Sequence, residues 1–126
     1  MRVDVFVNMQ AGLVNSGFAE EKITGKIRTA LFRCELFFHC TRSVQEMSEA
    51  LVRCCQEKSD HILLCGGDGT LSCALRTLIP LKQENVVLPI ISVIPLGTAN
   101  DFANETGVSS KIENAAHLIL EGKIAE

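Results

Sequence analysis

Short apolar runs typical of β-strands alternate, along this chain of 126 residues, with segments whose apolar residues recur at helical spacing. The strand-like runs are residues 3–7, 35–40, 61–65 and 86–94. The helix-like segments begin at or near Phe18, Ser43, Thr70, Thr98 and Ser110. This alternation predicts a single domain of α/β class, a doubly wound three-layer sandwich with a mostly parallel sheet and right-handed crossovers.

Local signals refine these boundaries. Ser43 followed by Glu46 forms a capping box and predicts a helix start. The wholly apolar run 61–65 suits a central strand that is covered on both faces. Pro80 predicts that the third helix ends before it, and Pro89 indicates an edge strand or a bulge near the start of the last strand.

Two glycine-rich loops follow neighbouring strand-like runs and precede helix-like segments. They are residues 66–70 (GGDGT) and 95–102 (PLGTANDF). In a parallel sheet both loops, and the turn at residues 8–12, lie at the carboxyl ends of the strands, where ligands of such folds bind. Free backbone amides and helix dipoles at that position favour phosphate. The pattern therefore predicts a nucleotide site.

Asp68 is the unusual member of the first loop, because a carboxylate beside a triphosphate is repelled unless a cation or a proton intervenes. It indicates either Mg²⁺, held directly or through water, or a proton relay. The alternative is that Asp68 only stabilises the glycine-rich turn. The loop is neither a Walker A sequence nor G-x-G-x-x-G, so a phosphate cradle here would depend on backbone groups and Mg²⁺.

The second loop offers further polar groups. Thr98 and the amides around Gly97 could hold another phosphate oxygen. Asp101 either contacts the ligand or complements the dipole of the helix that follows, and Asn100 either contacts the ligand or braces the first loop.

Composition excludes several functional classes. The formal net charge is −3 and there is no basic run, so we do not expect nucleic-acid binding. The longest apolar stretch, residues 86–96, is too short to cross a bilayer. No signal peptide precedes the first strand, and we therefore expect a cytoplasmic protein.

The cysteines and histidines show no metal-ligand spacing. No C-x-x-C pair is present, and the thiols fall mostly at apolar positions of the expected elements, so we predict buried free thiols and neither disulfides nor a metal site. The cysteines are Cys34, Cys40, Cys54, Cys55, Cys65 and Cys73. The histidines His39, His61 and His117 are scattered, and structural roles are expected for them.

The two loops together resemble the bacterial diacylglycerol kinase and lipid kinase family, which belongs to a larger group with NAD kinases and 6-phosphofructokinases. The GGDGT loop is shared across that group, whereas G-T-x-N-D-F-A at residues 97–103 is specific to the lipid-kinase branch. The resemblance spans essentially the whole chain as an amino-terminal nucleotide-binding domain of phosphofructokinase-like fold. It implies ATP- and Mg²⁺-dependent phosphorylation of a lipid hydroxyl.

The resemblance also implies roles for individual residues. The ATP phosphates would be held by Gly66, Gly67, Asp68, Gly69 and Thr70, with Asp68 as the candidate for catalysis or metal placement. Gly97, Thr98, Asn100 and Asp101 would contribute from the second loop, and Thr41, Asn8 and Gly12 from the neighbouring strand ends. The family's N-P-x-S-G in the first loop is replaced here by N-M-Q-A-G at residues 8–12.

In similar proteins a second, β-rich domain supplies acidic Mg²⁺ ligands and much of the lipid pocket. That domain is absent from residues 1–126, so we expect this chain alone to transfer phosphate poorly. We expect a lipid partner at the inner face of a membrane, and homo-oligomerisation stays open. The alternatives are an NAD kinase-like enzyme and a degenerate nucleotide-binding regulatory module.

Overall fold

Strands and helices alternate as the sequence predicts. A computed structural model of the chain describes residues 1–8, 17–66 and 68–95. The elements are β1 (Arg2–Asn8), α1 (Gly17–Ala30), β2 (Glu35–Thr41), α2 (Val44–Gln56), β3 (His61–Gly66), α3 (Asp68–Gln83) and β4 (Ile90–Pro95). The expected helices near Thr98 and Ser110 lie outside the described residues.

The four strands form one parallel sheet in the order β2-β1-β3-β4. The chain first adds β2 on one side of β1 and then β3 and β4 on the other. The order therefore reverses between β1 and β3, and such a switch point opens a crevice at the carboxyl ends of the strands. The α/β class and the parallel sheet are confirmed.

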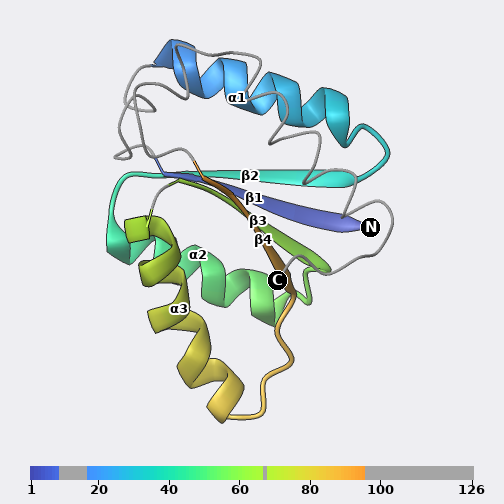
Figure 1. The fold of residues 1–126 in the computed structure, drawn as a ribbon. Helices are drawn as coiled ribbons and strands as arrows, with labels where there is room; N and C mark the ends of the chain where they lie inside the picture. Colours follow the sequence, from blue (N-terminus) through green and yellow to red (C-terminus); the bar gives the residue numbers. More distant parts are fainter. Residues whose placement is uncertain (9–16, 67, 96–126) are drawn as a thin grey trace.

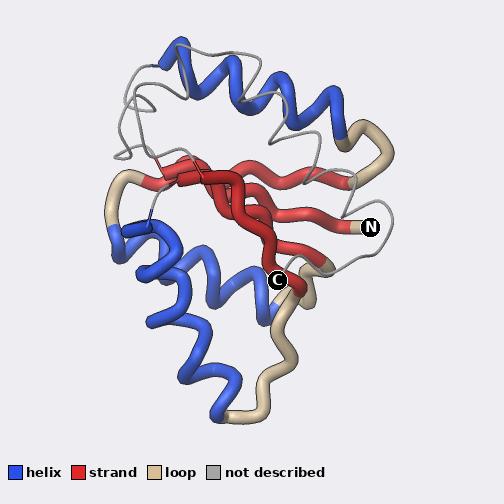
Figure 2. The backbone as a smooth tube through the Cα atoms, viewed as in Figure 1, coloured by secondary structure: helices blue, strands red, loops and turns tan. Residues whose placement is uncertain are grey.

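Helices cover both faces of the sheet, which gives the three layers seen in Figure 1 and, by secondary structure, in Figure 2. Side chains of β1 alternate between the two faces. Val3, Val5 and Val7 pack in one buried cluster with Ile23 and Ile27 of α1. In a second cluster, Phe6 packs with residues of α2 and α3, among them Met47, Leu51, Ala74 and Leu78.

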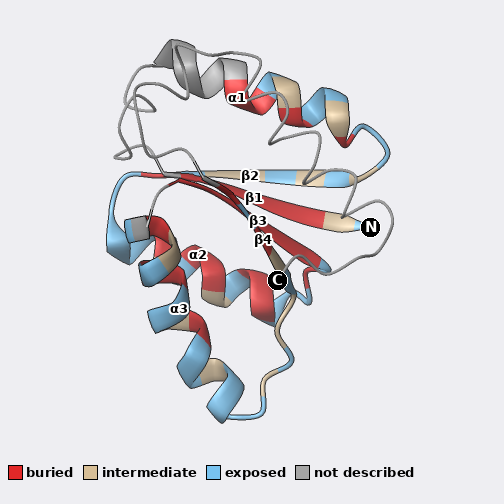
Figure 3. Cartoon of the chain, in the orientation of Figure 1, coloured by how far each residue is buried: buried red, intermediate tan, exposed pale blue. Residues whose placement is uncertain are grey.

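Strand β3 is the central strand that its apolar sequence predicts. It pairs with β1 on one side and β4 on the other, and all six of its residues are buried (Figure 3). Ile62 and Leu64 face α2 and α3, while Leu63 and Cys65 face α1. This strand fixes the position of the glycine turn that follows it.

The predicted end of the third helix is wrong. Helix α3 passes through Pro80 and continues to Gln83. Pro80 has no N–H to donate to the carbonyl of Arg76, but Pro80 is exposed on the outer side of the helix, so water can reach that carbonyl. The last turn is retained because Glu84 donates its amide to the Pro80 carbonyl at 3.1 Å.

The predicted start of the last strand is also wrong. Residues 86–89 are not part of a strand, and β4 begins at Ile90. Pro89 lacks an N–H, and pairing starts one residue later, where Ile90 donates to the Asp60 carbonyl at 3.3 Å. Among the described strands, β4 pairs only with β3, as expected if Pro89 marks an edge strand.

Four of the six predicted buried thiols are buried, Cys54, Cys55, Cys65 and Cys73, whereas Cys34 is half-buried and Cys40 is exposed. Burial raises the pKa of Cys65 to about 12. Within the described residues, no helix combines the length and the apolar character that crossing a membrane requires.

Candidate functional site

The carboxyl ends of the strands bring several predicted site residues to one side of the sheet. Asn8 at the end of β1 lies opposite Thr41 at the end of β2, and Gly66 at the end of β3 lies opposite Pro95 at the end of β4. The parallel register therefore places Asn8, Thr41 and Gly66 together at the switch point. This is the position at which ligands of such sheets bind.

The turn from β3 into α3 brings Gly66 into close contact with Thr70. A Cβ atom on Gly66 would overlap Oγ1 of Thr70 and lie 2.8 Å from its Cβ. Thr70 itself is buried. Only a residue without a side chain allows Thr70 to sit against the strand end, so the glycine sets how tightly α3 begins.

Helix α3 starts at Asp68, two residues before the expected position. The first amides of a helix have no partner within it, so those of Asp68 and Gly69 are available as donors at the positive end of the dipole. The space beside the Gly69 Cα is open, with no atom within 4 Å of a Cβ built there. A ligand could thus approach this backbone closely.

The start of α2 lies beside the start of α3. Ser43 is its N-cap and accepts a hydrogen bond from the Glu46 amide at 3.1 Å. Glu46 in turn accepts from the amide of Arg42 at 2.9 Å, which confirms the predicted capping box with the partner shifted by one residue. The amides of Val44 and Gln45 remain without an intrahelical partner.

A small cavity joins these two helix starts. It has a volume of about 40 Å³ and is lined by Thr41, Ser43, Val44, Met47, Gly69, Thr70 and Cys73. That is room for a few waters or for the tip of a ligand, so a larger molecule must lie mostly outside it, over the strand ends. Three hydroxyls and two helix N-termini surround the cavity, and such groups are suited to an anion such as a phosphate.

The structure brings together Thr41, Gly69 and Thr70 in the lining of this cavity, and Gly66 lies against the side chain of Thr70. Asn8 is the last residue of β1 and Asp68 is the first residue of α3, so the backbones of both lie at this edge of the sheet. The other candidates, Gly12, Gly67, Gly97, Thr98, Asn100 and Asp101, lie outside the described residues.

The sequence-based site omitted Ser43. The signal was available, because a capping box two residues after Thr41 places a helix N-terminus next to a predicted ligand residue. The sequence pattern predicts Ser43 only as a helix cap, yet Ser43 lines the cavity as well.

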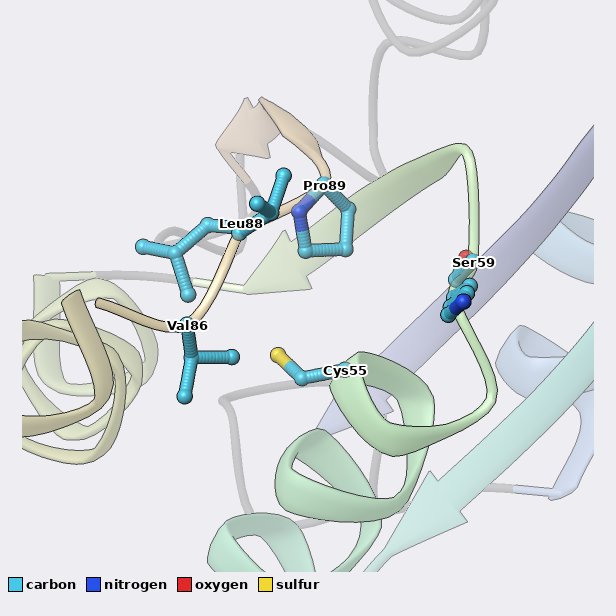
Figure 4. A pocket seen from close by; sticks show the side chains of 7 residues that line it. Cys55, Ser59, Val86, Leu88 and Pro89 are labelled. Carbon is cyan, nitrogen blue, oxygen red and sulfur yellow. The ribbon is translucent and has the colours of Figure 1, made fainter. Parts of the chain in front are cut away.

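A larger cavity lies at the opposite, amino end of the strands. Its volume is about 480 Å³, and its lining residues, Cys55, Lys58, Ser59 and 86–89, are mostly apolar. Figure 4 shows the Cys55 sulfur directed into the space beside Val86 and Leu88. Burial raises the pKa of Cys55, so its thiol stays protonated. None of the predicted site residues that the structure describes lines this cavity.

A parallel α/β sheet with a switch point and helix starts at the carboxyl ends of its strands defines a class of doubly wound proteins in which ligands bind at this edge. Comparison with known families identifies the member of that class. The family model of the diacylglycerol kinase catalytic domain matches residues 2–126. The chain belongs to this family.

Named relatives agree with the family. A protein of Pectobacterium atrosepticum named "Probable lipid kinase YegS-like" is 37% identical over 68 residues, which are 54% of this chain and 22% of that protein. A protein of the same name from Stenotrophomonas maltophilia is 43% identical over 60 residues, 48% of this chain and 19% of its own length.

A solved structure shares the fold. The crystal structure of a diacylglycerol kinase from Bacillus anthracis str. Sterne superposes with a TM-score of 0.65 at 29% identity and covers 96% of this chain. This chain covers 40% of that protein. The match to the named relatives is shorter still, about a fifth of their length.

Proposed function

We propose that this chain is the nucleotide-binding domain of an ATP- and Mg²⁺-dependent lipid kinase, which transfers the γ-phosphate of ATP to a lipid hydroxyl together with a second, β-rich domain. The observation that carries the proposal is the cavity between the starts of α2 and α3, beside the glycine turn at the end of β3. Membership of the diacylglycerol kinase catalytic domain family supports the same assignment.

The residues present fit a phosphate group. Gly69 leaves its backbone open to a ligand, and the hydroxyls of Thr41, Ser43 and Thr70 line the adjoining cavity. Among the described residues no lysine or arginine lines this cavity, so we expect binding here to depend on amides, hydroxyls and a cation brought with the nucleotide. The assigned phosphate contacts from Gly67, Gly97 and Thr98 belong to the same proposal.

Mg²⁺ fits the one carboxylate at the start of α3. Magnesium in phosphoryl-transfer sites is held by one or two carboxylates together with phosphate oxygens and water. Asp68 is the first residue of α3, the helix whose start adjoins the proposed phosphate site, and we assign its carboxylate to metal placement. When bound, Mg²⁺ neutralises phosphate charge, and the chain's own amides and hydroxyls orient the phosphates for transfer.

The wider setting of the reaction belongs to the proposal as well. The lipid acceptor would be reached at the inner face of a membrane by a cytoplasmic protein. Because this chain corresponds to only part of its relatives, we expect the remaining acidic ligands and the lipid pocket to come from the second domain. The isolated chain would then bind ATP but transfer phosphate poorly.

Gly69→Ala tests the site directly. The added methyl meets no protein atom within 4 Å, so the fold tolerates it, but it occupies the space in which a phosphate would approach the helix start. ATP binding is measured by calorimetry with and without Mg²⁺. We expect Mg²⁺-enhanced binding by the wild-type chain and at least about tenfold weaker binding by Gly69→Ala, corresponding to about 1.4 kcal/mol.

Gly25→Ala is the matched control. Gly25 lies in α1, and a Cβ there also meets nothing within 4 Å. It adds the same methyl to another helix and is expected to leave ATP binding unchanged. Equal affinities for both variants and the wild type would place the nucleotide elsewhere, and a preference for NAD over ATP would favour the NAD kinase-like alternative.

A further inference from the structure

A second group of chemically active side chains lies inside the sheet–helix layer, away from the cavity described above. Asp4 of β1, His39 of β2 and Cys54 of α2 come from three different elements. Their ligand atoms all lie within 4.8 Å of one another. Asp4 is fully buried and Cys54 nearly so, whereas the His39 side chain is 24% exposed and gives access from solvent.

The positions of the three side chains are fixed by their neighbours. The His39 ring stacks on the Phe6 ring, with centroids 4.6 Å apart. His39 Nε2 donates to Oδ1 of Asp4 at 2.8 Å, and the Cys54 sulfur lies 3.8 Å from the same nitrogen. Arg2 contacts both carboxylate oxygens of Asp4: Oδ2 accepts from Nε of Arg2 at 3.0 Å, and Oδ1 also accepts a longer hydrogen bond from Nη2 of Arg2 at 3.3 Å.

The group is close to the geometry of a metal site. A tetrahedral zinc ion with ordinary bond lengths places a thiolate sulfur and an imidazole nitrogen about 3.5 Å apart, and the nitrogen and a carboxylate oxygen about 3.3 Å apart. The sulfur and nitrogen are already near that separation. Nε2 and Oδ1 need to move apart by only about half an ångström.

The charges around the group also favour a cation. One cation, Arg2, contacts three carboxylates: it bonds Asp4 and Glu57 through its side chain and Asp60 through its backbone amide. Arg2 and the three carboxylates together carry a net charge of −2. A divalent ion that binds with loss of the thiol proton would bring this to −1.

We propose that Asp4, His39 and Cys54 form a binding site for a thiophilic divalent cation of the zinc type. The ligands are Oδ1 of Asp4, Nε2 of His39 and the Cys54 thiolate, with water in the fourth position on the exposed side of His39. Arg2 keeps its hydrogen bond to Oδ2 and orients the carboxylate from outside the ligand shell.

Binding requires two proton movements. Cys54 loses its thiol proton to solvent, and the proton on Nε2 of His39 moves to Nδ1. Because binding releases the thiol proton, it weakens as the pH falls. The metal would join β1, β2 and α2 and would stabilise the fold rather than take part in phosphate transfer, because Asp4 lies four residues, about 13 Å, from the end of β1.

Cobalt(II) provides the test, because a cobalt–thiolate bond gives a near-ultraviolet charge-transfer band. The reduced, chelator-treated 126-residue chain is titrated with Co²⁺ and then with Zn²⁺. We expect one Co²⁺ per chain, the thiolate band, and its loss when Zn²⁺ displaces the cobalt. Cys54→Ala should lose the band and bind Co²⁺ at least about tenfold more weakly.

Cys55→Ala is the matched control, since Cys55 is also buried on α2 but lies outside the group. It should retain the band. In the wild-type chain, NMR signals of the His39 ring should shift with Zn²⁺ while those of His61, which bonds Ser92, should not. A folded wild-type chain without the band, or a band that survives in Cys54→Ala, would show that the three side chains form only an ion-pair network.

Discussion

Gly66 at the end of β3 lies directly against the side chain of Thr70, so the strand and the first turn of α3 touch where any Cβ would intervene. The φ angle of Gly66 is not in the left-handed region, and the requirement for glycine is therefore one of space alone. This contact places the open backbone of Gly69 at the switch point of the sheet.

Gly66→Ala should therefore destabilise the protein. The new methyl must displace Thr70 or the start of α3 in a buried turn, and overpacking of this kind costs about 1–3 kcal/mol of unfolding free energy. Urea denaturation followed by circular dichroism measures the change. Gly25→Ala should instead add about 0.5–1 kcal/mol, because alanine favours the helix and nothing obstructs it. Equal effects from the two variants would show that the Gly66–Thr70 contact relaxes freely.

Ser43→Ala tests the start of α2. Ser43 accepts the Glu46 amide, and loss of an N-cap hydroxyl typically lowers the unfolding free energy by about 1 kcal/mol. Ser72→Ala is the control, since Ser72 is exposed within α3 and alanine there should be neutral or slightly stabilising. If Ser43→Ala were as stable as the wild type, the helix start would have to be fixed by Glu46 alone.

Much of this fold was accessible from the sequence because its signals are local. The apolar run at 61–65 identified a central strand, and the Ser43–Glu46 pair identified the start of α2 almost to the residue. Pro80 led to a wrong prediction of the helix end, because a proline ends a helix only where the lost backbone hydrogen bond cannot be replaced. In an exposed last turn, water can bond to the unpaired carbonyl instead. Exposure of that turn depends on packing, which no local pattern records.

The two candidate sites also differ in how far the sequence predicts them. Gly66, Gly69 and Thr70 could be found because they lie at or just after the carboxyl end of a strand, and parallel strands bring these ends together. Thr41, the last residue of β2, was found through the family resemblance. The group of Asp4, His39 and Cys54 could not be found, because its members come from three elements and have no characteristic spacing. Their approach depends on the register of β1 with β2 and on which side of α2 faces the sheet.

Asp68→Asn separates a metal-placing role from a structural one. If Asp68 works through Mg²⁺, removing its charge relieves repulsion of metal-free ATP, so binding without Mg²⁺ should strengthen while the enhancement by Mg²⁺ shrinks. One like-charge contact in water is worth about 1 kcal/mol, or roughly fivefold in affinity. Calorimetry with and without Mg²⁺ measures both values. Glu84→Gln removes the same charge from beyond the far end of α3 and should change neither. An unaltered Mg²⁺ enhancement in Asp68→Asn would leave Asp68 as a turn residue.

His61 should make stability depend on pH near neutrality. Its Nε2 lies 2.8 Å from the Ser92 hydroxyl in a buried position, and burial lowers the pKa of His61 below its ordinary 6.5. The unfolded chain therefore takes up a proton at a higher pH than the folded one, and the unfolding free energy decreases as the pH falls through about 6.5.

The decrease is at most about 1.4 kcal/mol per pH unit and stops once the folded-state pKa is passed. His61→Gln keeps a polar group that can reach Ser92 but does not titrate. Chemical denaturation of both proteins between pH 5 and 8 (about 1.5 units either side of 6.5) should show the wild type losing stability relative to the variant as the pH falls. Parallel curves would mean that His61 titrates alike in both states, and the lowered pKa would then be wrong.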